Sequence, residues 1–221
     1  MRASTAGGCY GSRQGGVPVW GDPHGAAGMA ALVAMALKNG GQNRAALDAL
    51  DPKPGDVVLE LGCGPGMGMR AALKRVGPSG FVAGVDRSGC AVHTAAHAVH
   101  NALLSGRASV LRADAANLPF KDMMFDRAFA VNTFQFWPDP ARALREIARV
   151  LAPRGRLVIT QRASNPGKPT DFAGAAGGLE RIDQASALLK AQGWRMIDER
   201  CVADGARLMA ASVLAERPWA C

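Results

Sequence analysis

Residues 57–68 constrain the fold of this chain more than any other stretch. Val57 to Leu61 is a short apolar run, typical of a parallel strand that is covered on both faces. It is followed by Gly62, Gly64, Gly66 and Gly68. Glycines allow positive φ angles and let a ligand lie directly on the backbone. The stretch predicts a buried strand that runs through a tight turn into a helix, where open α/β sheets bind nucleotide-like molecules.

The glycine spacing departs from the dinucleotide-binding pattern G-x-G-x-x-G. That pattern needs a third glycine at position 67 or 69, and both positions are methionine. An acid, Glu60, lies just inside the strand instead. A carboxylate there suits a ligand with an amino group and a sulfonium better than one with a pyrophosphate. A tight turn without a ligand is the alternative, although four glycines there would be unfavourable in backbone entropy.

Length and composition indicate one α/β domain with a full core, since the chain has 221 residues, of which 48% are hydrophobic. Its net charge of +8 would favour an anionic partner, but the arginines are scattered. We therefore expect a charged, solvated surface and no nucleic-acid partner. The five cysteines include no C-x-x-C pair, no apolar stretch could span a membrane, and no hydrophobic signal core begins the chain. These features predict a cytoplasmic protein, monomeric or homodimeric.

The N-terminal region changes character near residue 23. Residues 1–22 are rich in small and polar residues and should form a flexible tail. Residues 26–38 predict an apolar helix that includes Met29, and Gly40-Gly41 should interrupt it before a second helix capped by Asn43. Three interpretations of the apolar helix stay open: packing at the domain edge, a lid over a hydrophobic substrate, and shallow contact with a membrane surface.

Polar residues follow three further predicted strands. Asp86 ends the strand at 81–85, Asp114 follows 108–112, and Asn132 follows 125–131. An acid at the position of Asp86 can accept hydrogen bonds from both hydroxyls of a ribose. Asp114 could accept from an adenine amino group. The sequence therefore predicts an adenosine pocket at the carboxyl ends of the strands.

The segment after Asn132 predicts an acceptor site that is apolar and yet able to orient a ligand. Asn132 and Gln135 could position the acceptor, with Phe134 and Trp137 beside it, although these rings could instead belong to the core. Four further candidates come from the N-terminal region. His24 is the histidine best placed to act as a base, and Tyr10, Trp20 and Met29 could cover the substrate.

Three histidines, His93, His97 and His100, recur at one face of a helix predicted from residue 88 to about 105. We interpret them as a solvated helix face and predict no metal site.

The remaining chain completes a seven-stranded sheet. A helix at 140–151, a strand at 156–160, a loop at 161–177 and a helix at 179–192 precede two closing strands, 194–203 and 206–215. Asp204-Gly205 is typical of the hairpin turn between these strands. The predicted fold is α/β and Rossmann-like, with a mostly parallel sheet, an antiparallel last strand and helices on both faces.

With these motifs the chain resembles the class I S-adenosylmethionine-dependent methyltransferases. The segment Leu118-Pro119-Phe120, followed by Phe125-Asp126, Leu144-Arg145-Glu146 and Arg149-Val150-Leu151, resembles the branch with ubiquinone/menaquinone C-methyltransferases and many small-molecule methyltransferases. The likeness covers residues 52–160, the expected cofactor-binding core. Residues 23–51 would be a helical lid and residues 161–221 a C-terminal helix and hairpin of the same domain.

The resemblance implies S-adenosylmethionine as cofactor and assigns roles to several residues. Asn132 would line the methyl-donor side, Asp86 and Arg87 the ribose side, and Asp114 and Ala115 the adenine. The methionine part would lie on Glu60, Gly62, Cys63, Gly64, Pro65 and Gly66.

The implied reaction is transfer of a methyl group to an O, N or C atom of a small molecule of an aromatic or lipid-like class. Relatives often carry paired histidines after the fourth strand, where this chain has Phe134-Gln135-Phe136-Trp137. This departure weighs against methylation of a quinone ring. Alternatives are a non-catalytic domain that binds the cofactor as a partner or regulator, a nicotinamide oxidoreductase, and methylation of RNA or protein.

Overall fold

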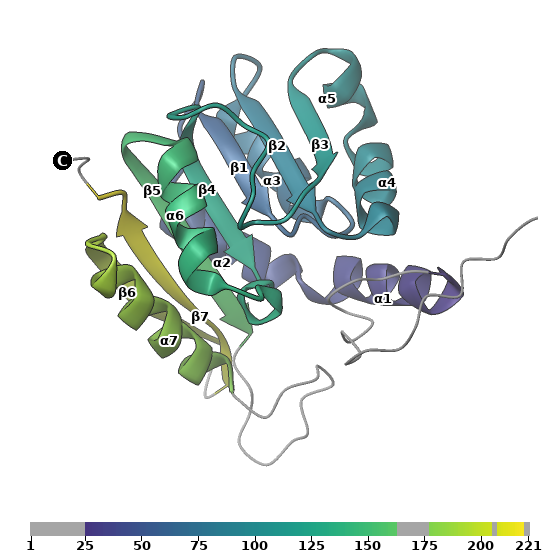
Figure 1. Ribbon diagram of the computed structural model, residues 1–221. Helices are drawn as coiled ribbons and strands as arrows, with labels where there is room; N and C mark the ends of the chain where they lie inside the picture. Colours follow the sequence, from purple (N-terminus) through teal and green to yellow (C-terminus); the bar gives the residue numbers. More distant parts are fainter. Residues whose placement is uncertain (1–24, 163–176, 205–206, 219–221) are drawn as a thin grey trace, which may run out of the picture.

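The computed structural model describes residues 25–162, 177–204 and 207–218. These residues form a seven-stranded sheet in the order β3-β2-β1-β4-β5-β7-β6 (Figure 1). Neighbouring strands are parallel except around β7, which is antiparallel to both β5 and β6. The strands are β1 (Val57–Leu61), β2 (Phe81–Asp86), β3 (Ala108–Arg112), β4 (Phe125–Val131), β5 (Leu151–Arg162), β6 (Arg195–Asp204) and β7 (Arg207–Glu216). The predicted Rossmann-like fold is confirmed.

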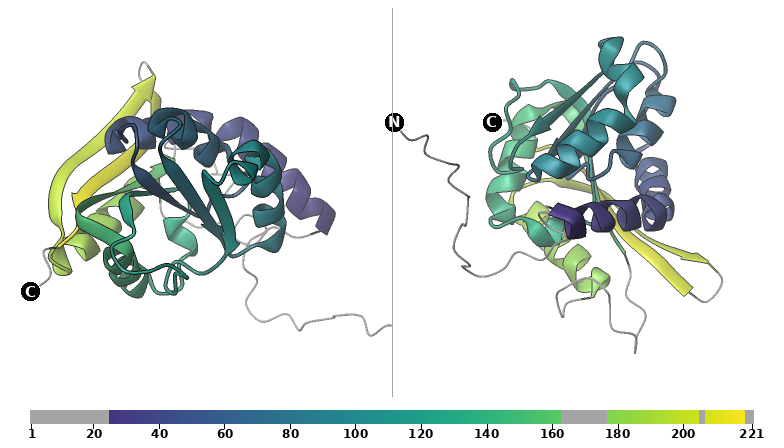
Figure 2. Two further views of the ribbon diagram at one scale, coloured as in Figure 1. Left: turned by 90° about the horizontal axis from the view of Figure 1, so that it is seen from above. Right: turned by 90° about the vertical axis from the view of Figure 1, so that its right-hand side faces the viewer.

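Helices cover both faces of the sheet, as Figures 1 and 2 show. On one face lie α2 (Gly40–Leu50), α3 (Met67–Val76), α4 (Gly89–Ala98) and α5 (His100–Leu104). On the other lie η1 (Phe134–Phe136), α6 (Pro140–Val150) and α7 (Gly178–Ala191). A further helix, α1 (Gly25–Lys38), lies past the end of the sheet to which β1 and β2 point, and it contacts α2 and α4.

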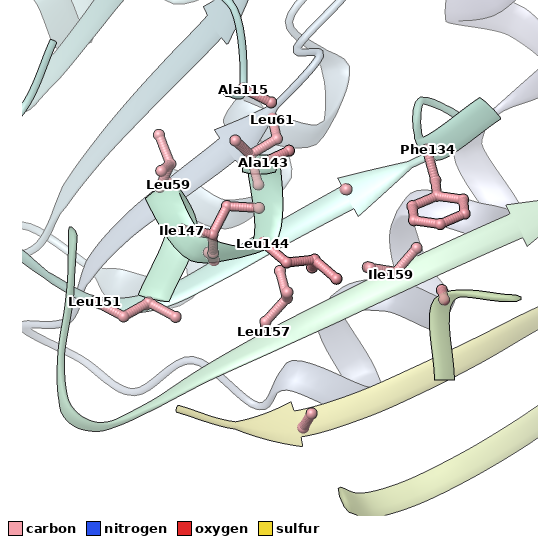
Figure 3. Close-up of a cluster of buried hydrophobic side chains, with 14 of the residues drawn as sticks. Leu59, Leu61, Ala115, Phe134, Ala143, Leu144, Ile147, Leu151, Leu157 and Ile159 are labelled. Carbon is pink, nitrogen blue, oxygen red and sulfur yellow. The ribbon is translucent and has the colours of Figure 1, made fainter. Parts of the chain in front are cut away.

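Two apolar clusters hold these layers together. Leu59, Leu144 and Leu157 belong to the cluster beneath α6 and α7 (Figure 3). Leu47 and Val58 belong to the cluster beneath α2 and α3. Successive residues of β1 thus enter opposite clusters, as expected for a strand with both faces covered.

The strand order places a topological switch point between β1 and β4. The chain runs outward from β1 through β2 to β3, and β4 then returns to pair with the other side of β1. Ligands of open α/β sheets bind at the carboxyl ends of the strands at such a point. The glycine turn after β1 and the polar segment after β4 therefore lie side by side at this edge of the sheet.

The start of α2 differs from the prediction. The helix begins at Gly40, so Asn43 is a buried residue inside it and not its N-cap. Asn39 occupies the N-cap position without capping through its side chain, because its Oδ1 accepts a hydrogen bond from Arg162 Nη2 at 2.9 Å. Packing of α2 against the sheet therefore outweighs the weak helix propensity of Gly40-Gly41.

The helix predicted from residue 88 to about 105 is in fact two helices. Val99, with φ −114° and ψ 21°, separates α4 from α5 while its side chain stays buried. His100 therefore belongs to α5 and does not continue the face of α4 that carries His93 and His97.

Strand β5 is longer than predicted at both ends, because it begins at Leu151 directly after α6 and continues to Arg162, into the loop predicted at 161–177. Its pairing with β4 shifts register between Phe125 and Arg127, and Arg154 adopts a left-handed conformation with φ 64° in this irregular part. Predictions for Tyr10, Trp20, His24, the tail at 1–22 and the loop at 163–176 lie outside the described residues.

Candidate cofactor site

The glycine turn after β1 has the backbone geometry that its sequence predicts. Gly62, Gly64 and Gly66 have φ angles of 71°, 50° and 81°. The N–H groups of Gly62 and Cys63 both donate to the carbonyl of Val85, at 2.8 and 3.0 Å. The turn is therefore fixed to β2 by the protein's own hydrogen bonds.

Gly62 is also needed for close packing, which the sequence did not indicate. A Cβ atom at this position would lie 2.3 Å from Cγ2 of Thr133. Thr133 Oγ1 in turn donates to the carbonyl of Leu61 at 3.3 Å. Thr133 therefore joins the end of β4 to the end of β1 at the switch point.

Asp86 connects the glycine turn to the next helix. Its Oδ2 accepts a hydrogen bond from Gly64 N at 2.9 Å, and its Oδ1 accepts one from Ser88 N at 2.9 Å. Ser88 is the N-cap of α4 and accepts from Ala91 N. Asp86 therefore places its carboxylate between the glycine turn and the start of α4.

Glu60 is a buried acid directly behind the turn, only 3% exposed. A Cβ on Gly68 would lie 2.1 Å from its Oε1, so glycine there makes room for the carboxyl group. Burial raises the pKa of Glu60 well above its ordinary value; a hydrogen bond from Met69 N opposes this shift, and the charge of Asp86 adds to it. Oε2 of Glu60 is buried and has no hydrogen-bond partner.

This arrangement fits a cationic ligand. An unpartnered buried carboxyl oxygen is unfavourable unless a donor or a positive group satisfies it. A sulfonium or ammonium group near Glu60 and Asp86 would favour the charged carboxylate. The residues present are therefore compatible with S-adenosylmethionine.

Asp114 lies in a turn after β3 and beside Arg87. Its Oδ1 accepts from Ala116 N at 2.9 Å, and its Oδ2 lies 3.5 Å from Arg87 Nε. Arg87 also donates through Nη1 to the carbonyl of Phe136 at 3.4 Å. Arg87 thus connects the end of β2 with the loop after β3 and with η1.

Asn132 ties β4 to β5, with a left-handed φ of 57°. Its N–H donates to Thr160 O at 2.9 Å, and its Oδ1 accepts from Arg162 N at 2.7 Å. Its carbonyl accepts from Gln135 Nε2 at 2.8 Å. The structure therefore brings Asn132 and Gln135 together. The side-chain oxygen Oδ1 of Asn132 accepts a hydrogen bond from a backbone N–H group of β5.

Phe134 is a correction to the predicted substrate residues. It is 2% exposed and belongs to the core cluster beneath α6 and α7, and Figure 3 shows its ring near Ile159. Trp137 is half-buried and packs on Phe134 with ring centroids 5.3 Å apart. Met29 lies in α1, and its side chain is not described.

Cys63 lies in the glycine turn with its side chain in the core. The residue is 3% exposed and packs in the cluster beneath α2 and α3. Its N–H is used by Val85, and its carbonyl accepts from Gly66 N at 2.9 Å. Cys63 therefore fixes the shape of the turn through its backbone hydrogen bonds and its buried side chain.

Arg149, which the sequence showed only as part of a motif, organises the segment that follows Asp114. Its guanidinium donates to both carboxylate oxygens of Glu146, each at 2.9 Å, and to the carbonyls of Leu118 and Phe120 at 3.0 and 2.9 Å. Nη1 also donates to Asp122 at 2.6 Å. Glu146 Oε2 in turn accepts from Leu118 N at 3.0 Å. We name these contacts the Arg149 hub (Arg149, Glu146, Leu118, Phe120 and Asp122).

Arg162, at the end of β5, also connects separate segments of the chain through hydrogen bonds. Its Nη2 donates to the carbonyl of Lys38 and to Oδ1 of Asn39, both at 2.9 Å. Its backbone N–H is the donor to Asn132. The junction of α1 and α2 is therefore attached to the carboxyl ends of β4 and β5.

Known proteins show the same combination of turn and fold. A family profile described as a methyltransferase domain matches residues 59–159. This segment is thus similar to methyltransferase domains. The matched range begins inside β1 and ends in β5, so the domain profile includes Glu60, the glycine turn, Asp86, Asp114 and Asn132.

Curated relatives extend beyond the matched domain. The chain is 32% identical over 177 residues to methyltransferase GfsG of Streptomyces halstedii, covering 76% of this chain and 63% of that protein. It is 33% identical over 137 residues to demethylmenaquinone methyltransferase of Lactobacillus johnsonii, covering 61% and 56%. The chain thus spans less than two thirds of the length of these relatives.

Solved structures share the fold. A SAM-dependent methyltransferase from Aquifex aeolicus superposes with a TM-score of 0.65 at 24% identity, covering 83% of this chain and 92% of that one. Among the described residues, no helix combines the length and apolarity needed to cross a membrane.

Proposed function

We propose that this protein is an S-adenosylmethionine-dependent methyltransferase that acts on a small molecule. One observation carries the proposal: Glu60, Asp86 and Asp114 stand at or just beyond the ends of three neighbouring strands, beside a glycine turn that hydrogen bonds fix to β2. Asp86 and the buried Glu60 place two carboxyl groups beside this turn in a chain of net charge +8. Such a site favours a ligand that carries positive charge. The match of residues 59–159 to the methyltransferase domain supports the same conclusion.

Each part of the site would hold one part of the cofactor. Glu60 and the turn Gly62–Gly66 would face the methionine part, with Gly64 and Pro65 at its apex. Asp86 would accept from the ribose hydroxyls with Arg87 beside it, and Asp114 and Ala115 would face the adenine. When bound, the cofactor supplies a methyl group on a sulfonium, which is already a good leaving group.

The acceptor would lie against the segment after β4. Gln135 Oε1 is buried and has no hydrogen-bond partner, whereas its Nε2 is held by the carbonyl of Asn132. This arrangement suits the orientation of an acceptor's polar group, with the half-buried Trp137 beside it. Holding the acceptor in line can supply about 7–11 kcal/mol without an acid or base. A base such as His24 is needed only for a hydroxyl or an acidic carbon.

The substrate is best sought among small aromatic or lipid-like molecules with an O, N or C acceptor atom. The names of the relatives, which include a demethylmenaquinone methyltransferase, support this range. α1, with Met29, would be a lid, and Trp20 would close over the acceptor. A cytoplasmic location, a monomeric or homodimeric state, and peripheral contact of α1 with a membrane are parts of the same proposal.

Calorimetric titration with S-adenosylhomocysteine tests the cofactor site. We expect binding by the wild type and roughly 100-fold weaker binding by Asp86→Ala, since two hydrogen bonds to a charged group contribute about 3 kcal/mol. Asp183→Ala is the matched control, because Asp183 is an exposed acid on α7. Absence of binding by the wild type would refute the proposal.

Methyl transfer is tested separately. Purified protein is incubated with methyl-labelled cofactor and a panel of phenols, quinols, amines and prenylated alcohols, and labelled products are counted. Binding of the cofactor without transfer to any acceptor would favour the non-catalytic alternative, a domain that binds the cofactor as a partner or regulator.

A further inference from the structure

Helix α4 carries two exposed histidines one turn apart. His93 Nε2 and His97 Nε2 lie 3.2 Å from each other, and the two ring centroids are 4.6 Å apart with the planes at 80°. His100 lies beyond the helix break at Val99. The structure therefore isolates a pair where the sequence indicated a row of three.

The distance between the two nitrogens suits one shared metal ion. Zinc lies about 2.0–2.1 Å from a histidine nitrogen. Two nitrogens at that distance are about 3.0 Å apart at an octahedral right angle and about 3.4 Å apart at a tetrahedral angle. The 3.2 Å between His93 and His97 lies between these values. Histidines spaced i, i+4 on a helix are a known arrangement for binding zinc.

The position on the helix also favours a cation. His97 is in the last turn of α4, where backbone carbonyls carry partial negative charge. The helix, GCAVHTAAHA, contains no lysine or arginine that would repel the ion. Both rings are exposed, so water can complete the coordination.

We propose that His93 and His97 form a two-histidine site for a divalent transition-metal ion of the zinc, nickel and copper class. Imidazole suits all three ions. Within the described parts of the chain, no three His, Cys, Asp or Glu side chains gather at one point. The remaining ligands would therefore be water molecules. The site is separate from the proposed methyltransferase site and does not depend on that function.

A bound ion would link two successive turns of α4, the helix that packs against the glycine turn. Ala95 lies between the two histidines in sequence but is fully buried. A Cβ on Gly66 would lie 2.9 Å from the Cα of Ala95, so α4 and the glycine turn are in contact there. Ion binding should therefore raise the melting temperature, as any ligand of the folded state does.

Calorimetric titration of the full-length, tag-free protein with NiCl₂ tests the proposal. The protein is first treated with chelator and kept in a non-coordinating buffer with a phosphine reductant. Nickel is the probe because the thiols of Cys63, Cys90 and Cys201, which form no disulfide, attract softer metals. We expect saturable binding and a rise in melting temperature with nickel. His93→Gln and His97→Gln should each weaken binding at least tenfold and remove that rise.

His100→Gln is the matched control and should bind like the wild type. Unchanged nickel affinity in both His93→Gln and His97→Gln would overturn the proposal, as would absence of binding by the wild type. Loss of binding in Cys90→Ser with both histidine variants unaffected would also overturn it, because the ligand would then be a thiolate. Far-UV circular dichroism checks that each variant is folded.

Discussion

The Arg149 hub yields the sharpest prediction, the effect of Arg149→Met. The substitution removes two hydrogen bonds to the carbonyls of Leu118 and Phe120, each contributing about 0.5–1.5 kcal/mol. It also removes the paired contact with Glu146, whose side chain is 22% exposed, which we place at about 1 kcal/mol after screening by solvent. The contact with Asp122, 68% exposed, should contribute little.

The sum is about 3 kcal/mol, a large part of the roughly 5–15 kcal/mol that stabilises a typical protein. For a chain of this length, that loss corresponds to a fall in melting temperature of about 6–12 °C. Arg149→Lys should retain little of the wild-type stability, because a lysine cannot make the paired contact or reach both carbonyls together.

Urea denaturation of the wild type and the variants measures these differences. Arg145→Met is the matched control, since Arg145 is an exposed arginine on the same helix, α6. Because the hub holds the segment that follows Asp114, Arg149→Met should also weaken binding of S-adenosylhomocysteine. If Arg149→Met and Arg145→Met destabilise the protein equally, the structural interpretation of the hub is wrong.

Three further predictions concern ionisation and the glycine turn. Arg149 lowers the pKa of Glu146, so the contact between the two residues should stabilise the protein above the unfolded pKa of about 4.3 and lose this effect as pH falls. The difference in melting temperature between wild type and Glu146→Gln should therefore vanish in acid. Burial raises the pKa of Glu60, so the stability of the wild type should fall as pH rises above about 4.3, and Glu60→Gln should then be the more stable protein. The variant should nevertheless bind S-adenosylhomocysteine more weakly. Equal melting temperatures of the wild type at pH 5 and pH 8 would contradict this prediction. Gly77→Ala, at φ 68° and ψ −167° with open space around it, should cost about 1–3 kcal/mol from backbone strain. Gly62→Ala should cost more, because its Cβ would also lie 2.3 Å from a side-chain carbon of Thr133; urea denaturation compares the two variants.

Local signals in the sequence predicted the frame of the site. The apolar run of β1, the glycines and Asp86 are linked by short spacings, so the amino-acid pattern alone locates them. The alternation of strands and helices predicted a mostly parallel Rossmann-like sheet, whereas the order of its strands became clear only from the structure. These features depend on backbone geometry, which neighbouring residues largely determine.

Contacts between distant segments were not predictable in this way. The burial of Phe134 depends on α7, which lies more than forty residues later in the chain. The approach of Thr133 to Gly62 and the contacts of Arg162 with Lys38 and Asn39 join separate parts of the chain. The start of α2 at Gly40 was missed because packing against the sheet, and not local propensity, determines it.

The position of β7 has a consequence for the order of folding during synthesis. It lies between β5 and β6, although both are made before it. Until residues 207–216 leave the ribosome, the edge of β5 has no partner and β6 has nothing to pair with. A nascent chain therefore exposes an open strand edge, a site for aberrant pairing with other chains. Truncation before β7 should expose the same edge permanently, and such a fragment should aggregate.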